Sequence, residues 1–326
     1  RPPLNGRALH PSATNNMRYA RIKGLDKDIS RLVMGCDNQT TMPHAAVMFD
    51  DFIEKGGNCF DSAHIYGGYE GGESGICEEV LGQWIKDRGV RNDITLISKG
   101  GHTPNCHPQG ITEQLEESLQ RLQTDHVDIY FMHRDNLDLP VSDFIDVLNK
   151  HVKAGKIKLF GGSNWSIERV NAANEYAAQN GLQGFSAVSN NFSLAQLVNP
   201  VWPGCVSSSD AESRAWLEKA NIALFPWSSQ ARGFFTDRSG QDKLDDEELV
   251  RCWYSEDNFQ RKDRAQELAE QKGVSTINIA LAYVLTQPFP VFTLIGPRTL
   301  EETRTSLPGL DIKLTPEEVR YLNLED

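Results

Sequence analysis

Short apolar runs alternate with amphipathic segments of helix length along almost the whole chain. The strand-like runs lie at residues 30–36, 58–63, 93–101, 127–133, 157–165, 185–191, 222–229 and 291–296. Segments with apolar residues at three- and four-residue spacing follow them, as in amphipathic helices. Such alternation is typical of parallel strands joined by helical crossovers. Eight units in series predict an α/β fold, the closed (β/α)8 TIM barrel.

The barrel is expected to be a single domain over residues 17–326, because no break in composition divides this range. No G-x-G-x-x-G follows an early strand, which argues against a Rossmann domain. Residues 1–16, RPPLNGRALHPSATNN, are rich in Pro and Asn and lack periodicity. They are interpreted as an N-terminal extension or linker, which would suit an upstream fused domain before residue 1.

Composition excludes several partners. Lys and Arg number 33 against 45 Asp and Glu, a formal charge of −12, which disfavours nucleic acid and anionic membrane surfaces. No apolar run approaches the ~18 residues of a membrane span, and no secretory signal opens the chain. Six cysteines without a C-x-x-C pair indicate free thiols, and therefore a cytoplasmic location.

Four polar residues follow or close neighbouring strands, where barrel enzymes place their working groups. They are Asp61, Tyr66, Lys99 and His133. A free Tyr has a pKa near ~10, and a neighbouring ammonium lowers it. A carboxylate would hold the Lys in place, and an imidazole would orient a carbonyl oxygen. Such a set would protonate that oxygen as a hydride reaches the carbon.

Several segments carry a family resemblance, in order and at the expected barrel positions: CFDSAHIYGGYEGGES, ISKGG, IYFMHRDN, GGSNW, FPWSSQARGFF and LIGPRTLEETRTSL. Over residues 17–326 the chain resembles the aldo-keto reductase family. The resemblance implies an NAD(P)H-dependent oxidoreductase that reduces an aldehyde or ketone to an alcohol. It assigns Tyr66 as the general acid, Lys99 and Asp61 as the pair that tunes it, and His133 as the group that orients the carbonyl.

The same resemblance implies a nicotinamide dinucleotide bound without a Rossmann fold. Ser163 and Asn164 match residues that hold the carboxamide, and Trp227 matches the aromatic ring that stacks on the nicotinamide. The remaining matches run along the pyrophosphate and then the adenosine end: Ser228, Ser229, Gln230 and Arg232, followed by Gly296, Arg298, Glu302 and Ser306.

Two positions depart from the family pattern. Ser189 replaces the usual Gln, so its hydrogen bond to the carboxamide is expected to be shorter, water-bridged or absent. Glu302 replaces a Gln or Arg, and a carboxylate disfavours a 2′-phosphate, whereas the guanidinium of Arg298 would pair with one. Family habit favours NADPH, and NADH stays open as the alternative.

Arg134, Asn136 and Trp165 are the candidate substrate contacts. Polar groups beside an aromatic face suit a sugar or keto-sugar, and the WPGC segment at 202–205 resembles family members fused to sugar oxidoreductases. Other aromatic residues on these loops fit either the core or the pocket: Trp202, Phe234 and Phe235.

Two other classes compete with the enzyme hypothesis. A nucleotide-binding partner module, like the potassium-channel beta subunits, would retain the same four residues, but no long charged or coiled-coil segment supports it. A metal-dependent barrel hydrolase lacks paired strand-end ligands beyond Asp61 and His133. The loop with His102, Cys106 and His107 is broken by proline and has no matching partners, so no metal is expected.

Overall fold

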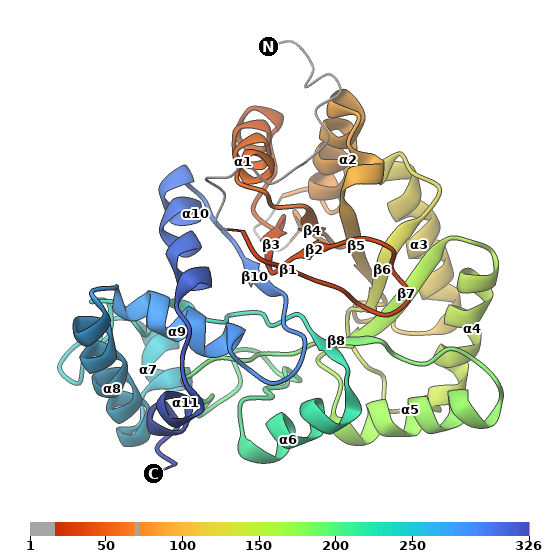
Figure 1. Cartoon of the computed structure of the whole chain (residues 1–326). Helices are drawn as coiled ribbons and strands as arrows, with labels where there is room; N and C mark the ends of the chain where they lie inside the picture. The colour runs from red at the N-terminus through yellow and green to blue at the C-terminus, as the bar shows by residue number, and fades with distance from the viewer. Residues whose placement is uncertain (1–16, 69–71, 326) are drawn as a thin grey trace.

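The computed structural model describes residues 17–68 and 72–325, and the expected extension at 1–16 lies outside them. Eight parallel strands form one sheet in the order β10-β3-β4-β5-β6-β7-β8-β9. Leu224 and Val291 pair through a further parallel bridge, which joins the two ends of that order. The predicted (β/α)8 barrel is therefore confirmed, with a ring of helices around the strands (Figure 1).

Each barrel strand falls within one of the predicted apolar runs. The bounds are β3 Leu32–Gly35, β4 Cys59–Asp61, β5 Thr95–Gly100, β6 Val127–Met132, β7 Ile157–Ser163, β8 Ala187–Ser189, β9 Ala223–Leu224 and β10 Thr293–Ile295.

Several helices begin at polar caps that satisfy one of their first amide groups. Ser166, Asp210, Ser255 and Ser275 each accept a hydrogen bond from the third residue of the following helix. The bounds are α1 Met42–Glu54, α2 Ile76–Arg88, α3 Pro108–Leu122, α4 Val141–Lys153, α5 Ile167–Gln179, α6 Ala211–Ala220, α7 Glu247–Trp253, α8 Glu256–Lys272, α9 Thr276–Leu285, α10 Leu300–Ser306 and α11 Pro316–Leu322.

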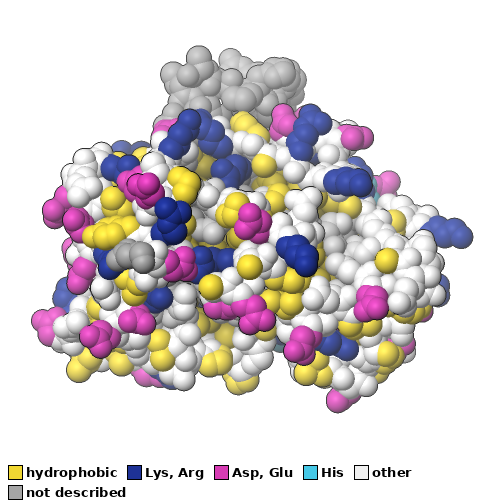
Figure 2. All heavy atoms as spheres, turned by 60° about the horizontal axis from the view of Figure 1, so that its bottom comes forward, with side chains coloured by type: hydrophobic (Ala, Val, Ile, Leu, Met, Phe, Trp, Pro, Cys, Tyr) yellow, Lys and Arg dark blue, Asp and Glu magenta, His cyan; other side chains and the backbone are white. Residues whose placement is uncertain are grey.

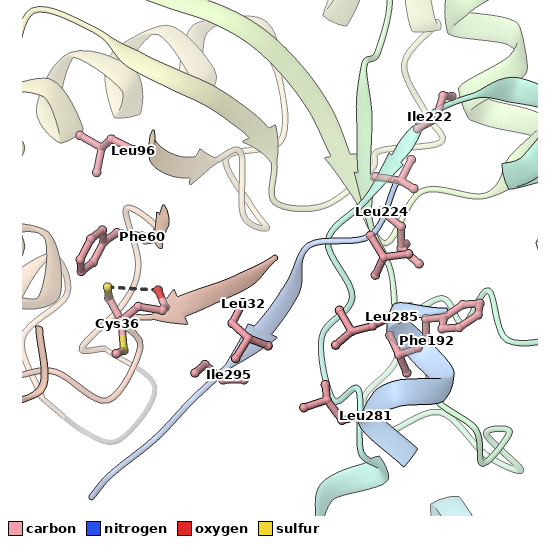
Figure 3. Packing of buried hydrophobic residues seen from close by; sticks show 14 of the residues in the cluster. Leu32, Cys36, Phe60, Leu96, Phe192, Ile222, Leu224, Leu281, Leu285 and Ile295 are labelled. Carbon is pink, nitrogen blue, oxygen red and sulfur yellow. Dashed lines mark hydrogen bonds between the residues drawn. The ribbon is translucent and has the colours of Figure 1, made fainter. Parts of the chain in front are cut away.

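Side-chain alternation along the strands divides the core into two layers. Leu32 belongs to the outer cluster between strands and helices, whereas the next residue, Val33, belongs to the cluster inside the barrel. Figure 3 shows part of the outer layer, with Phe60 and Leu96 on the helix side of their strands. The barrel is thus filled by side chains and is no pore.

A short hairpin that the sequence pattern did not reveal closes one end of the barrel. Strands β1 Tyr19–Ala20 and β2 Ile29–Ser30 pair antiparallel, and the hairpin segment crosses the barrel in Figure 1. Ile22, Leu25 and Ile29 are buried in the same cluster as the interior strand residues. Since this plug covers the end where the strands begin, their carboxyl ends are left to build a site.

The surface is mixed in charge. Figure 2 shows acidic and basic side chains interspersed on one face, without a continuous field of one sign. In the portion of the chain that is described, no helix combines the length and apolarity needed to cross a membrane. All six cysteines are free thiols.

Candidate active site

A cavity of about 1360 Å³ lies where the strands end. Its lining contains all four proposed acid–base residues, Asp61, Tyr66, Lys99 and His133. It also contains every residue proposed for the cofactor: Ser163, Asn164, Ser189, Trp227, Ser228, Ser229, Gln230, Arg232, Gly296, Arg298, Glu302 and Ser306. The tertiary structure therefore brings together side chains from Asp61 to Ser306. This is expected of a barrel, because the loops after all eight strands meet at one end.

The acid–base residues come from three adjacent strands and the loop after the first. Asp61 ends β4, Lys99 lies near the end of β5, and His133 follows β6. The Lys99 ammonium donates to Asp61 Oδ1 at 2.6 Å and to the Ser62 carbonyl at 3.2 Å. The ion pair is buried, with 3% and 5% of the two side chains exposed.

Tyr66 lies close to both the ion pair and the imidazole. The Lys99 Nζ is 5.0 Å from the centre of the Tyr66 ring. The Tyr66 and His133 rings meet edge to face, with centroids 5.8 Å apart. A nearby positive charge stabilises a phenolate, so an ammonium beside a phenol favours donation of the phenolic proton.

Burial shapes the charge of the neighbouring groups. It lowers the pKa of His133 well below its usual value, and the positive charges of Lys99 and Arg134 add to the effect. The imidazole is therefore neutral at neutral pH, so it offers the cavity a hydrogen bond and not a charge. Burial also raises the pKa of Asp61, while the nearby Lys99 ammonium opposes that shift.

The end of β7 carries two polar groups fixed by β8. The Ser163 hydroxyl donates to the Ser189 carbonyl at 3.0 Å, and the Asn164 amide Nδ2 lies 3.4 Å from Ser163 Oγ. Asn164 Oδ1 accepts the Val206 amide at 3.0 Å. Asn164 adopts a left-handed backbone conformation, with φ of 57°. Such strain concentrates at functional sites, because the surrounding structure must hold it.

Residues 228–233 form a tight loop beside Trp227. Ser228, Ala231, Arg232 and Gly233 all have positive φ, between 49° and 101°. Residues other than glycine rarely adopt this conformation. The Arg232 Nε donates to Glu248 at 2.6 Å, which ties the loop to α7. A turn of this kind presents amide groups and a guanidinium to the cavity, a combination that suits phosphate.

Opposing charges meet at the other end of the cavity. Glu302 accepts a hydrogen bond from the backbone amide of Arg298 at 2.5 Å. The Ser306 hydroxyl donates to the Glu302 carbonyl at 2.8 Å. Both charged residues, Arg298 and Glu302, line the cavity. They are neighbours, although the guanidinium would attract a 2′-phosphate and the carboxylate would repel it.

The cavity fits a nicotinamide dinucleotide. It exceeds the ~300–1,000 Å³ common for small-ligand sites. An ideal Cβ on Gly296 would meet no atom within 4 Å, so the wall there is open. The buried Trp227 Nε1 finds no hydrogen-bond partner in the described parts of the chain. An aromatic face, amide groups and cations thus follow one another along one continuous wall.

Two of the three proposed substrate contacts lie elsewhere. Trp165 is fully buried. Its ring packs edge to face on Phe144 and Phe185, and Nε1 donates to the Arg134 carbonyl at 3.2 Å. Asn136 donates to the Cys106 carbonyl at 3.0 Å. Neither lines the cavity, because both side chains are used to hold the loop itself. Only Arg134 does.

Trp202 takes the aromatic position that Trp165 was expected to fill. It lines the cavity and stacks on Trp227, with ring centroids 4.5 Å apart. The other aromatic candidates from these loops are core residues: Phe234 and Phe235. Long-range folding of the loop after β8 decides this, since the local sequence gives no sign of which ring faces inward.

Further cavity residues were not proposed from the sequence. His102 follows β5, and its ring lies 5.1 Å from that of His133. Asp37 follows β3, so the strand-end rule could have found both. The others come from more distant loops and helices, where no local pattern marks them: Arg238, Glu248, Asn278 and Thr305. In residues 17–68 and 72–325, no group of three His, Cys, Asp or Glu is placed to hold a metal ion.

A barrel with a buried Asp–Lys pair, Tyr and His at one end of a long cavity defines a class of barrel oxidoreductases. A family model described as "Aldo/keto reductase family" matches residues 32–324. The chain therefore belongs to the aldo/keto reductase family.

Individual relatives are distant and cover most of the chain. An uncharacterized oxidoreductase of Bacillus subtilis, YrpG, is 25% identical over 94% of this chain and 95% of its own length. An aryl-alcohol dehydrogenase [NADP(+)] of Phanerodontia chrysosporium is 26% identical, covering 85% of this chain and 74% of that protein. A solved glycerol dehydrogenase from Gluconobacter oxydans has a TM-score of 0.73 at 22% identity, with 94% of each chain covered. That last likeness supports the barrel fold alone.

Proposed function

We propose that this protein uses NADPH to reduce an aldehyde or ketone to an alcohol. One observation carries the proposal. The buried Lys99–Asp61 pair lies beside the Tyr66 ring, and the ring of a neutral His133 also contacts Tyr66. These groups share a cavity with residues that fit a nicotinamide dinucleotide.

The reduction divides between cofactor and protein. The cofactor, when bound, would supply the hydride for the carbonyl carbon. Tyr66 donates its phenolic proton to the carbonyl oxygen, so that hydride and proton together yield the alcohol. Lys99 stabilises the phenolate that is left, and Asp61 keeps the ammonium in position. His133 donates a hydrogen bond that orients the oxygen, which a neutral imidazole is able to do.

The preference for NADPH depends on Arg298. A guanidinium forms strong, often bidentate, hydrogen bonds with phosphate. The Glu302 carboxylate already accepts the Arg298 amide, so part of its capacity is used within the protein. NADH is the competing cofactor, and fluorescence titration with each nucleotide decides between them. Tighter binding of NADH would reverse this assignment.

The substrate is proposed to be a small polar carbonyl compound. The cavity surface beside His133 combines Arg134 with the ring of Trp202. A sugar or keto-sugar would use the guanidinium for its hydroxyls and the ring for its C–H face, with Trp202 replacing Trp165. Similar proteins are named for aryl alcohols and for glycerol, so aromatic aldehydes and glyceraldehyde are suitable first probes.

Replacing Tyr66 with Phe tests the proposal. Tyr66→Phe should abolish NADPH oxidation with every carbonyl tried, while nucleotide binding is retained. Tyr176→Phe is the matched control, because the Tyr176 hydroxyl bonds Asp146 on the surface. Undiminished turnover in Tyr66→Phe would refute the assignment. Saturable nucleotide binding with turnover slower than minutes per event would favour a nucleotide-binding partner module.

A further inference from the structure

Arg134 places a guanidinium at the substrate end of the cavity. It directly follows His133 in the chain and donates to the His133 carbonyl at 2.8 Å. Its guanidinium carbon lies 5.5 Å from the centre of the Trp202 ring. Stacking on an aromatic face holds the planar group in one orientation without using its remaining N–H donors.

Among the residues that the structure describes, the positive charge of Arg134 has no carboxylate partner. Within the described ranges, no Asp or Glu oxygen lies within 4.0 Å of it. The adjacent Asp135 is taken by Arg169, with two hydrogen bonds at 2.8 and 3.0 Å. Asp61, the carboxylate of the proposed acid–base set, is paired with Lys99.

Two other arginines that line the cavity differ from Arg134 in being paired with carboxylates. Arg232 is paired with Glu248, and Arg238 with Asp246. Arg232 lies on the loop proposed for the pyrophosphate, Arg238 follows that loop, and Arg298 is the residue proposed for the adenosine end of the nucleotide. Arg134 instead lies next to the group that would orient the carbonyl, so its charge faces the substrate and not the nucleotide phosphates.

We propose that Arg134 binds a carboxylate carried by the substrate, which makes the preferred substrates aldehyde or oxo acids. This rests on the carbonyl reduction proposed above. A guanidinium has five N–H donors, and one is used by the His133 carbonyl. The others suffice for a two-bond contact with a carboxylate, which is among the strongest hydrogen-bonding pairs. A neutral sugar would accept hydrogen bonds but leave the charge uncompensated.

The test compares acids with their methyl esters. Each of 3- and 4-carboxybenzaldehyde is paired with its ester, which keeps the ring and the aldehyde but removes the charge. In the wild type we expect kcat/KM to favour the acid by roughly 10- to 100-fold. Arg134→Met should remove that preference, and Arg134→Lys should restore part of it. Arg21→Met is the control, since Arg21 is an exposed surface residue paired with Asp28.

Calorimetry in the presence of NADP+ separates this proposal from the reaction itself. Tighter binding of the acid in the wild type, lost in Arg134→Met, supports the carboxylate site even if no aldehyde is turned over. Equal binding of acid and ester by the wild type overturns the proposed carboxylate site. This comparison uses the wild type alone, so it does not depend on whether a variant folds. Turnover of the esters with no preference for acids overturns the carboxylate site but leaves carbonyl reduction intact.

Discussion

Removing the ammonium of Lys99 should expose the cost of a buried, unpaired carboxylate. Lys99→Met keeps much of the apolar stem but leaves Asp61, which is 4% exposed, without its cation. At the observed 2.6 Å, two unit charges attract by about 6 kcal/mol at an effective dielectric constant of 20. Desolvation offsets part of that attraction, and losing one partner of such a pair typically costs about 3–5 kcal/mol.

Thermal unfolding measures this loss. An unfolding entropy of about 2.1 cal/mol/K per residue gives roughly 0.7 kcal/mol/K for 326 residues. The expected decrease in Tm is therefore about 4–7 °C. Lys55→Met is the control, because Lys55, the residue that caps the end of α1, pairs with Asp51 one turn earlier at partly exposed positions. Its loss should cost only about 0.3–0.5 kcal/mol.

The destabilisation should depend on pH. Burial already raises the pKa of Asp61, and Lys99 opposes the shift, so the variant has a folded-state pKa further above the unfolded value of about 3.9. The protonated carboxyl is then favoured in the folded state. The stability of Lys99→Met relative to the wild type is therefore greatest below the pKa that Asp61 has in the unfolded state. It is lost as the pH rises through the pKa that Asp61 has in the folded variant.

The double variant Lys99→Met with Asp61→Asn completes the test, because it removes both charges. It should recover most of the lost stability and abolish the added pH dependence. A Tm decrease below about 1 °C in Lys99→Met at neutral pH would be smaller than this argument allows. A decrease that stays constant from acid to neutral pH would likewise refute the role given to Asp61.

Three further outcomes are expected. Trp227→Ala should weaken nucleotide binding about tenfold, from the loss of ring contact, whereas Trp216→Ala, at a surface position bonded to Asn171, should leave the fluorescence titration unchanged. Arg298→Met should weaken NADPH binding roughly 10-fold or more with little change for NADH; an equal loss for both nucleotides would contradict the proposed phosphate contact. Gly82→Ala should lower Tm although Ala favours helices by about 1 kcal/mol, because the new Cβ would lie 2.3 Å from the Arg121 carbonyl oxygen; an unchanged Tm would show that α2 and α3 separate easily.

The barrel was predictable because its signal is local and repeated. Every barrel strand lies inside an apolar run that sequence analysis marked. The hairpin at β1 and β2 was not marked, since each of its strands has two residues. Helix α7 begins within the acidic run 242–249, whose sequence fits either a solvated loop or a helix start, and Asp246 caps it. Segments this short carry too few side chains for a periodic pattern to emerge.

In the candidate site, only residues at strand ends or within the family motifs could be predicted from the sequence. Asp61, Lys99 and His133 lie at strand ends, so the barrel geometry alone brings them together. Trp165 also follows a strand, yet its ring turns into the core between Phe144 and Phe185. A single residue's direction depends on packing by helices far away in the chain, which no local pattern records.

The amino-acid sequence by itself determined the fold class and the order of the strands, and it supplied the residues proposed for acid–base chemistry. The fold follows from periodicity, whereas the proposed residues follow from strand ends and from the family resemblance. Only the tertiary structure decided which aromatic residue, Trp202 and not Trp165, faces the cavity. Within residues 17–68 and 72–325, it also leaves Arg134 without a carboxylate partner, while the adjacent Asp135 is paired with Arg169. Side-chain packing and charge pairing depend on contacts between segments that are far apart in the sequence, and these contacts form only when the barrel folds.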